Sequence, residues 1–532
     1  MIDLKLIQDA VNLASSGKFE EAEKRFLELL DMEPDNYYVL SSLGLFYTSR
    51  KLYDNACVYL EKAYNIKKTA GTVSALGFCE YKKSNYQKAA AILEEALTYG
   101  ETEDIYNKLV LSLFKTEDYT KAIGYAEKMY QKYPQSPNSV ANMIKAMTHS
   151  ERIREAEVLC VEYLKEHPDT PDLWTHLGLL KELIYHDDKQ AYECYKAALD
   201  LGMLGAYYNM GVSLYKQKDF KNAEINLKKM LEICPGEKES EIVLALCYLT
   251  QKRFKEGYNL FFKRDTGFYD DVLRNHWAPG KEFENEVTVL CEQGYGDHLQ
   301  FSRYLPFLKE KTGKIYLAAP TPLKELFKNN FPYCEIIDKK DANPEIQVIR
   351  ITDLAYALDM DFDHIPSSGG YLNAPRAEIT SNKPKVGLCW EAGSAAIRTM
   401  LNRTINIRLF ERILNLENIQ LYSFQVQDTL SGNEKYPQMI NLAKDFKNFY
   451  DTAQAVKTMD LMLCVDTSVT HLAGALGVKT FLLLPEVTDW RWFDDTKTTP
   501  WYDSVEIFKQ TDPVSWEEQF EEITCRLKEF SL

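Results

Sequence analysis

The sequence predicts an α-helical repeat array in its first half and an α/β region of two lobes in its second half. Small residues recur at a nearly constant interval through the first half, and short β-branched runs alternate with helical stretches after about residue 285. A chain of 532 residues is too long for a single core, and its 45% hydrophobic content is enough to bury several. The predicted fold class is therefore α plus α/β, divided into more than one domain.

The repeat array is marked by small residues that lie 32 to 35 positions apart. These residues are Ala22, Ala56, Ala89, Ala122, Ala156, Ala191, Ala223 and Gly257. The period, together with Leu43-Gly44-x-x-Tyr47 and a proline such as Pro34 that closes a repeat, resembles the tetratricopeptide repeat (TPR). We therefore expect a superhelix of about eight repeats over residues 1–265. Its concave groove would suit an extended segment of a protein, although a spacer or a dimerisation surface is also compatible with repeats alone.

Composition and charge exclude several classes of function. A net charge of -16 argues against nonspecific nucleic-acid binding, which needs clustered Lys and Arg. The segment from Met1 to Lys5 has no basic and then apolar pattern, and apolar runs such as Leu461–Val465 are too short to span a bilayer. The cysteines form no Cys-x-x-Cys pair and are expected to be buried free thiols. We expect a cytoplasmic protein that neither enters a membrane nor binds nucleic acid.

Strand and helix patterns alternate in the second half, which is typical of parallel α/β sheets. The predicted strands are Val287–Cys291, Lys314–Leu317, Lys385–Trp390, Ile419–Phe424, Leu461–Val465 and Thr480–Leu484. A linker over residues 266–285 and a break near Pro384 divide this half into lobes at 286–380 and 381–532. Two Rossmann-like lobes would leave a ligand cleft at the carboxyl ends of their strands.

The first segment that could carry catalytic or binding residues follows the strand Val287–Cys291. Gly294-Tyr295-Gly296-Asp297 is predicted to form a turn before a helix from His298 to Leu308. The glycines would allow a tight turn and close approach of a ligand, and Asp297 would lie at the strand's carboxyl end, where a reacting group belongs. The alternative is that Asp297 only caps the helix.

The second segment follows the strand Leu461–Val465. Asp466, Thr467 and Ser468 are predicted to precede a helix that contains His471. Backbone amides, two hydroxyls and the positive end of a helix dipole would meet there, which predicts a phosphate site. The alternatives are that Asp466 is a helix cap and that His471 is a core histidine with satisfied hydrogen bonds.

The third segment follows the strand Lys385–Trp390. It contains Gly393 and Ser394, then a polar loop with Arg398 and Arg403 before a helix from about Ile407. An anionic leaving group in an acidic protein needs fixed cations, and these arginines follow a strand end on the same cleft.

Taken together, these motifs resemble the bacterial TPR-glycosyltransferases over nearly the whole chain. The matching residues are Glu256-Gly257-Tyr258, Glu292-Gln293-Gly294-x-Gly296-Asp297-x-x-Gln300-Phe301-x-Arg303-Tyr304-x-Pro306, Asp466-Thr467-x-x-x-His471-Leu472-Ala473-Gly474-Ala475-Leu476-Gly477, Asp489-Trp490-Arg491-Trp492 and Pro500-Trp501-Tyr502. The catalytic half is similar to the heptosyltransferases, and the overall plan is similar to the O-linked N-acetylglucosamine transferases and to TPR enzymes that modify flagellin. The resemblance implies a GT-B fold and an inverting, metal-independent reaction that needs no cofactor beyond a nucleotide-sugar co-substrate.

The resemblance also assigns roles to individual residues. It implies that Asp297 is the general base, and that Asp466, Thr467, Ser468 and His471 belong to the nucleotide-sugar motif. Arg403 matches a basic residue at the donor phosphates, although the loop over residues 395–402 departs from the family pattern and leaves Arg398 as an alternative. Gly294, Gly296, Gly393 and Ser394 complete the predicted donor-binding set.

The expected function is transfer of a sugar to a hydroxyl of a protein, with a flagellin-like acceptor bound by the TPR groove. Transfer to a glycan or lipid precursor, and a noncatalytic scaffold, are the alternatives. An Asp-x-Asp element at Asp359-Met360-Asp361 is expected to be a solvated acidic turn and not a metal site. The sugar, the nucleotide (UDP, GDP, ADP, dTDP or CMP) and the oligomeric state are left open.

Overall fold

The computed structural model describes residues 2–185, 187–264, 274–366, 368–392, 403–426, 432–493, 497–512 and 515–531. The chain forms two compact units, Met1–Ser213 and Leu214–Leu532. Among the described residues, no helix is both long enough and apolar enough to cross a bilayer. The boundaries that the sequence suggests at residues 265, 285 and 380 stay predictions.

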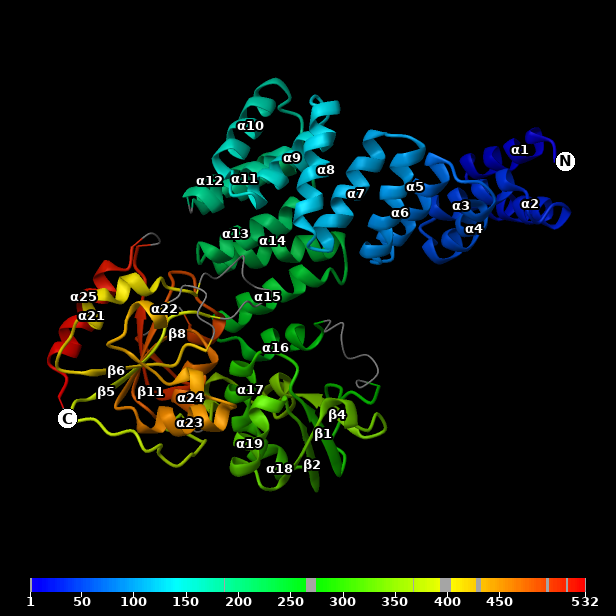
Figure 1. Ribbon diagram of the computed structural model, residues 1–532. Coiled ribbons are helices and arrows are strands. Elements are labelled where there is room, and N and C mark those ends of the chain that lie inside the picture. Colours follow the sequence, from blue (N-terminus) through cyan, green and yellow to red (C-terminus); the bar gives the residue numbers. More distant parts are fainter. Residues whose placement is uncertain are drawn as a thin grey trace. The chain divides into compact units, whose positions relative to one another are not determined.

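Every named element described before residue 264 is an α-helix, and successive helices form pairs (Figure 1). They are α1 (Leu4–Ser15), α2 (Phe19–Met32), α3 (Tyr37–Ser49), α4 (Tyr53–Ile66), α5 (Ala70–Lys82), α6 (Tyr86–Tyr99), α7 (Glu103–Lys115), α8 (Tyr119–Lys132), α9 (Pro137–His149), α10 (Ile153–Glu166), α11 (Pro171–Tyr185), α12 (Asp188–Asp200), α13 (Ala206–Lys216), α14 (Phe220–Ile233), α15 (Lys238–Thr250) and α16 (Phe254–Phe262). The predicted helical repeats are confirmed. The boundary between the two units falls inside α13, so α14–α16 belong to the second unit.

The small residues of the repeat pattern occupy one equivalent place in the structure. Each is the fourth residue of an even-numbered helix, and the alanines from Ala22 to Ala223 are completely buried. At Gly257 an added Cβ would lie 2.6 Å from Leu249 Cγ in the preceding helix. A larger side chain at this position would therefore separate the two helices of a repeat, which explains why the period shows so clearly in the sequence.

Helix contacts within the first unit give the array an inner face. Each odd-numbered helix from α1 to α9 contacts the next odd-numbered helix. In the described part of this unit, successive even-numbered helices make no contact of comparable extent. The odd-numbered helices are therefore closer together from repeat to repeat, and they form the inside of the curve.

The first sheet contains four parallel strands in the order β3-β2-β1-β4. Its strands are β1 (Glu286–Leu290), β2 (Lys314–Ala318), β3 (Cys334–Ile337) and β4 (Gln347–Arg350), and the helices that accompany it are α17 (Tyr295–Phe301), α18 (Leu305–Lys309), α19 (Thr321–Asn330) and α20 (Leu354–Ala357). Strand β1 lies between β2 and β4, with Val287 opposite both Ile315 and Gln347. The residues that follow β1 therefore leave from the middle of the sheet.

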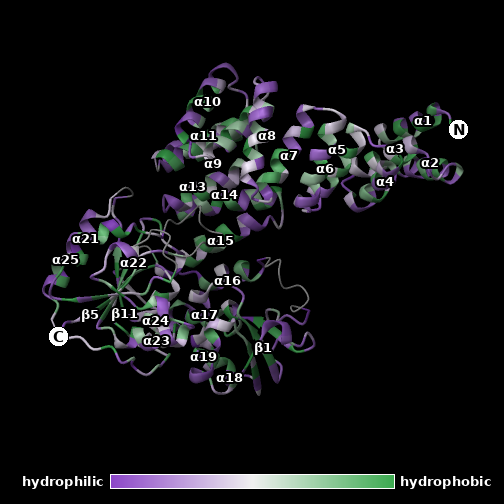
Figure 2. Ribbon diagram, in the orientation of Figure 1, coloured by the Kyte–Doolittle hydropathy of each residue, from purple (hydrophilic) through white to green (hydrophobic). Residues whose placement is uncertain are grey.

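The second sheet has the order β10-β11-β9-β8-β5-β6-β7, and all of its strands are parallel to their neighbours except β10. Its strands are β5 (Lys385–Cys389), β6 (Gln420–Ser423), β7 (Ile440–Asn441), β8 (Leu461–Val465), β9 (Thr480–Leu484), β10 (Thr498–Thr499) and β11 (Tyr502–Lys509). Helices α21 (Glu411–Leu414), α22 (Gly432–Lys435), α23 (Phe449–Thr458), α24 (Ser468–Ala475) and α25 (Glu517–Lys528) belong to this region. Strands β8 and β9 are buried throughout and β5 after its first residue, as expected for strands covered on both faces, and Figure 2 shows hydrophobic colours on β5.

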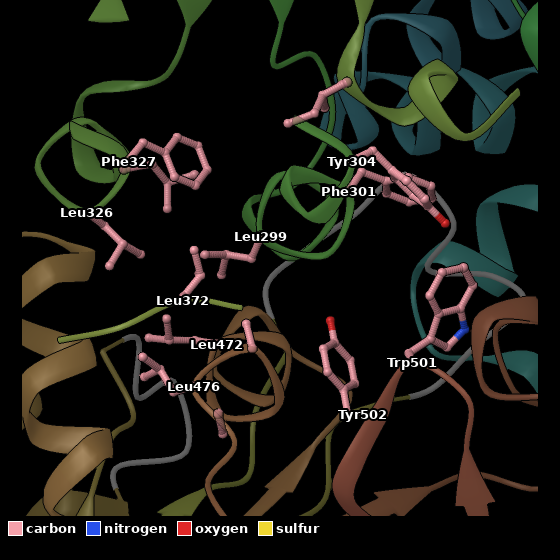
Figure 3. Close-up of a cluster of buried hydrophobic side chains, with 14 of the residues drawn as sticks. Leu299, Phe301, Tyr304, Leu326, Phe327, Leu372, Leu472, Leu476, Trp501 and Tyr502 are labelled. Atoms are coloured by element: carbon pink, nitrogen blue, oxygen red, sulfur yellow. The ribbon is translucent and has the colours of Figure 1, made fainter. Parts of the chain in front are cut away.

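The two sheets share one apolar core within the second unit. Leu299 of α17 and Leu472 of α24 belong to one buried cluster, with Tyr502 of β11 near Leu472 and Trp501 on the side of Phe301 (Figure 3). Both leucines are completely buried. Because this cluster draws side chains from both sheets, the two lobes are packed against each other.

A close contact within one repeat gives a test of the packing. A Cβ on Gly178 of α11 would lie 2.5 Å from Cε1 of Tyr195, which is 1% exposed and has no room to move. Gly178→Ala should lower the free energy of unfolding by about 1 to 3 kcal/mol, because the added methyl group overpacks this contact. Hydrogen exchange of the full chain, followed by mass spectrometry, should show lost protection in α11 and α12.

Gly124→Ala is the matched control, because Gly124 lies in α8 and an added Cβ there would meet nothing within 4 Å. This substitution should stabilise α8 by roughly 0.5 to 1 kcal/mol through backbone entropy. Equal protection of α11 in both variants would show that α11 and α12 are not in close contact at Gly178.

Candidate functional site

The helix after β1 begins earlier than the sequence suggests. It starts at Tyr295 and not at His298, so Gly296 and Asp297 lie in its first turn. The physical reason is that Asp297, the third helical residue, accepts a hydrogen bond through Oδ2 from the Gly294 N–H at 3.2 Å. Because Tyr295 to Asp297 are already helical, the predicted turn before the helix is wrong, and Gly294, with φ of -71°, does not adopt a left-handed conformation. The predicted continuous helix to Leu308 is also wrong, because a 3₁₀ turn at Ser302–Tyr304 separates α17 from α18.

Gly296 has a packing role that the sequence does not reveal. A Cβ at this position would lie 2.7 Å from Cδ2 of His471 and 3.6 Å from Cα of Ser468, both in α24. The glycine therefore lets α17, from the first lobe, approach α24, from the second. This contact brings the first two predicted segments together.

Asp297 is held at this contact by an arginine that the sequence analysis did not assign to the site. Asp297 Oδ1 accepts a hydrogen bond from Arg491 Nη2, and Asp489 Oδ1 accepts one from Arg491 Nη1 at 2.8 Å. Burial alone would lower the pKa of the Arg491 guanidinium, but the carboxylates of Asp297 and Asp489 outweigh it and raise the pKa above its usual value. Arg491 is therefore a fixed cation between the lobes. Its motif, Asp489-Trp490-Arg491-Trp492, was visible in the sequence but carried no role.

Asp466 is buried directly after β8, next to this arginine. Arg403 Nη1 lies 3.4 Å from Asp466 Oδ2, and His471 Nε2 lies 3.8 Å from Oδ1. Burial raises the pKa of the Asp466 carboxyl, and Arg403 opposes that shift. The N-cap of α24 is Thr467, so the alternative that Asp466 caps this helix is wrong.

His471 is fully engaged in the core. Its Nδ1 lies 3.0 Å from the Tyr502 hydroxyl, and its ring stacks on Trp492 with 5.2 Å between centroids. Burial lowers the pKa of the imidazole well below its usual value, so the ring is neutral near pH 7. This geometry agrees with the structural alternative for His471, in which the ring holds Tyr502 and Asp466 in place.

The predicted phosphate residues lie at the start of α24. Thr467 and Ser468 are half-buried, and Thr467 Oγ1 is 3.8 Å from Cys389 Sγ at the end of β5. The first turn of α17 packs on the first turn of α24, so the N-termini of the two helices lie close together. Gly393, Ser394 and Arg398 lie outside the described residues, so Arg403 alone represents the third predicted segment.

A buried ionic network extends from the other side of β1. Glu292 Oε1 accepts hydrogen bonds from Arg264 Nη2 and from the Thr352 hydroxyl, both at 2.6 Å. Asp353 accepts from Arg264 at 2.7 Å and from Arg350 at 2.5 Å. Arg264 follows α16, so the network joins the last repeat helix to the carboxyl ends of β1 and β4. Residue spacing carries no signal for it, because its members are far apart along the chain.

A pocket of about 550 Å³ opens at the carboxyl ends of β1, β2 and β3. Glu292, Gly294, His298 and Lys339 are among its lining residues. His298 Nε2 accepts a hydrogen bond from the Gln293 N–H at 3.1 Å, and burial lowers the pKa of the imidazole to about 4. The neutral ring therefore carries its proton on Nδ1, for which the described residues provide no acceptor. The pocket has the size and polarity of a small-molecule site.

The Asp-x-Asp element forms a local turn, as expected. Asp361 Oδ1 accepts hydrogen bonds from the N–H groups of Asp363 and His364, each at 3.1 Å. Over the part of the chain that the structure describes, His, Cys, Asp and Glu side chains form no group of three or more that could hold a metal ion.

Comparisons with known proteins identify the repeats. Family profiles described as tetratricopeptide repeat match residues 10–70, 80–137 and 113–180. The N-terminal helices are TPR repeats. No curated protein matches the chain.

Solved structures similar to the chain include other TPR proteins. A tetratricopeptide repeat protein from Parabacteroides merdae is 16% identical, with a TM-score of 0.43, and the match covers 46% of this chain and 97% of that one. A thermophilic TPR protein from Thermus thermophilus is 16% identical, with a TM-score of 0.32, over 34% of this chain and 100% of that one. Yeast Tom70 is 16% identical, with a TM-score of 0.39, over 46% of this chain and 54% of that one.

The close approach of α17 and α24 can be tested at Gly296. Gly296→Ala should force the helices apart, because His471 is fixed by Tyr502 and Trp492 and cannot give way to the new Cβ. We expect the free energy of unfolding to fall by about 1 to 3 kcal/mol and hydrogen exchange to become faster in α17 and α24.

Gly294→Ala is the control for this prediction. A Cβ there would lie 3.4 Å from Asp297 Oδ2, an ordinary contact, so exchange in α24 should stay as in the parent protein. If Gly296→Ala left exchange in α17 and α24 unchanged, the close packing of these two helices would be incorrect.

Proposed function

We propose that this chain is a glycosyltransferase that moves a sugar from a nucleotide-sugar donor to a hydroxyl group of a protein. The observation that carries the proposal is the position of Arg491. It bridges Asp297 and Asp489, and its charge also acts on Asp466. Three carboxylates and a fixed cation thus meet where the carboxyl ends of two parallel sheets face each other, which is where α/β proteins bind ligands.

Asp297 has the geometry that a general base needs. Each of its carboxylate oxygens has one hydrogen-bond donor, Arg491 for Oδ1 and the Gly294 N–H for Oδ2. A carboxylate offers about four lone-pair sites, so both oxygens keep capacity for another proton. The side chain is 19% exposed, which leaves an approach for a hydroxyl group. The two donors fix the orientation of the carboxylate before the substrate arrives.

The reaction proceeds as a single displacement. The acceptor oxygen forms a bond to the anomeric carbon and loses its proton to Asp297, while the bond from that carbon to the donor's phosphate oxygen breaks. The nucleotide leaves with the bonding electrons, and its phosphate gains negative charge. Arg403, the hydroxyls of Thr467 and Ser468, and the N-terminus of α24 stabilise this charge, which takes the place of a metal ion.

The TPR array supplies the second part of the proposal. TPR repeats typically bind protein segments, so the inner face of the array would bind the acceptor protein, a flagellin-like protein being one candidate. An acceptor that is a glycan or a lipid precursor would use the pocket beside Gly294 and would not need the repeats. A scaffold without catalytic activity would bind a protein and release no nucleotide.

The first test measures nucleotide release from UDP-, GDP-, ADP-, dTDP- and CMP-sugars by the purified full chain. At least one donor should be hydrolysed slowly with water as the acceptor. Asp297→Asn should reduce this rate about a hundredfold, because an amide cannot accept the proton, while its oxygen can still cap α17.

Asp489→Asn is the matched variant, since it removes a carboxylate from the same arginine without removing the base. Its rate should stay within about tenfold of the parent protein. Equal losses in the two variants would mean that Asp297 acts only by neutralising Arg491. Hydrolysis of no donor would support the scaffold alternative.

The second test concerns donor affinity. Arg403→Ala should raise the dissociation constant of the hydrolysed donor by about ten- to a hundredfold, because it removes a charge-assisted contact worth roughly 1.5 to 3 kcal/mol. Calorimetry is the appropriate measurement. Arg403→Lys keeps the charge and should lose less. An unchanged affinity in Arg403→Ala would shift the phosphate role to Arg398.

A further inference from the structure

The inner face of the first unit carries a row of lysines in a chain whose net charge is -16. Lys82 ends α5, Lys108 and Lys115 belong to α7, and Lys145 belongs to α9. Helix α9 has no Asp or Glu at all. These helices are successive members of the odd-numbered set that lies inside the curve, so the lysines lie on one side of the array.

Lys145 is held in an unusual environment for a lysine. It is half-buried, and its Nζ lies 4.3 Å above the ring of Phe114 from the neighbouring inner helix. His149 packs on the same ring with 5.1 Å between centroids. In the described part of the chain, no carboxylate forms an ion pair with Lys145 or Lys115. The ammonium group is therefore partly removed from water with only an aromatic ring as compensation.

This environment has an energetic cost. Burial lowers the pKa of Lys145, and the positive charge of Lys115 lowers it further. Lysines are rarely buried unless they are paired, and their long side chains usually bring the ammonium group to the surface. An apolar residue of the same length would fill the space at lower cost. The position of Lys145 therefore favours a role in binding an anion over a role in stability.

A lysine also lies over an aromatic ring one repeat earlier, but there Lys108 forms an ion pair with Asp104 at 2.6 Å. Lys108 and Lys82 lie 4.7 Å and 5.3 Å from the centroid of the Phe78 ring of α5. Asn107 and Asn142 are hydrogen-bonded at 2.8 Å between α7 and α9, so amide groups connect the two lysine sites. Asn142 is itself buried. Two aromatic and lysine sites on successive inner helices suit a ligand that extends along the array.

We propose that the inner face of α5, α7 and α9 binds an extended acidic segment of a partner protein, with one carboxylate on Lys145 and others on Lys115 and Lys82. Charge complementarity argues for this occupant, because no carboxylate of the described residues forms an ion pair with Lys145 or Lys115, and an acidic segment would supply carboxylates to both. The inference deepens the acceptor-binding part of the proposed function and rests on it only for the partner's identity as an acceptor. It can be tested without any sugar donor.

The test uses the full chain and a fluorescein-labelled peptide of repeated Glu-Ser, with fluorescence anisotropy as the readout. The parent protein should bind this peptide, and it should bind the corresponding Gln-Ser peptide at least about tenfold more weakly. Lys145→Met keeps the apolar stem and removes the charge, so it should weaken binding of the Glu-Ser peptide about tenfold or more. Because it also removes the desolvated ammonium group, exchange protection of α9 should stay equal or increase.

Lys128→Met is the matched control. Lys128 also lies over an aromatic ring, Tyr125 at 5.2 Å, but on the even-numbered helix α8. The affinity of the Lys128→Met variant for the Glu-Ser peptide should stay within about twofold of the value for the parent protein. The inference is overturned if the parent protein does not bind this peptide, if both variants bind it equally, or if α9 loses protection in Lys145→Met. Tighter binding of a labelled single-stranded oligonucleotide than of the peptide would assign the lysines to nucleic acid instead.

Discussion

The contact between α17 and α24 determines how the second unit is organised. Each helix follows the central part of its own parallel sheet, and each begins at the carboxyl end of a strand. Because Gly296 has no Cβ, the two amino-terminal turns can touch, and the apolar side chains of both lobes then form a single cluster. Asp297 and Arg491 are brought within hydrogen-bonding distance by this packing. The ion pair of Asp297 and Arg491 thus depends on the close approach of the two helices at Gly296.

The parts of the fold that depend on local spacing could be predicted from the sequence. The eight small residues revealed the helix pairs, because each must be small for the two helices of its own repeat to pack closely. Strands β8 and β9 were predicted with their observed bounds, since each is a continuous apolar run. Strands β3 and β4 were missed because both are short, and β4 contains the polar residues Gln347 and Arg350, which form hydrogen bonds with distant residues. The start of α17 was missed because the glycines suggested a turn.

The candidate site could be predicted only in part. The sequence analysis selected Asp297 and Asp466 because each closely follows a strand, and His471 because it lies in the helix that follows β8. Their partners could not be found, because Arg491 reaches Asp297 from 194 positions away and the network of Glu292, Arg264 and Asp353 joins residues that no local pattern relates. The steric role of Gly296 also needs the position of His471. Roles that depend on tertiary packing are invisible to spacing, whereas roles that depend on a strand end are not.

The network around Arg264 limits how this protein can be rebuilt by exchange of repeats. Arg264 follows α16, and it is bound to Glu292 and Asp353 in the first lobe. The last helical pair therefore belongs electrostatically to the α/β region, because without Arg264 two buried carboxylates would lose their shared cation. A chimaera that replaces the whole array would remove this cation along with the repeats. A chimaera joined before α15 would keep Arg264. The segment of repeats that can be exchanged is therefore shorter than the periodic sequence suggests.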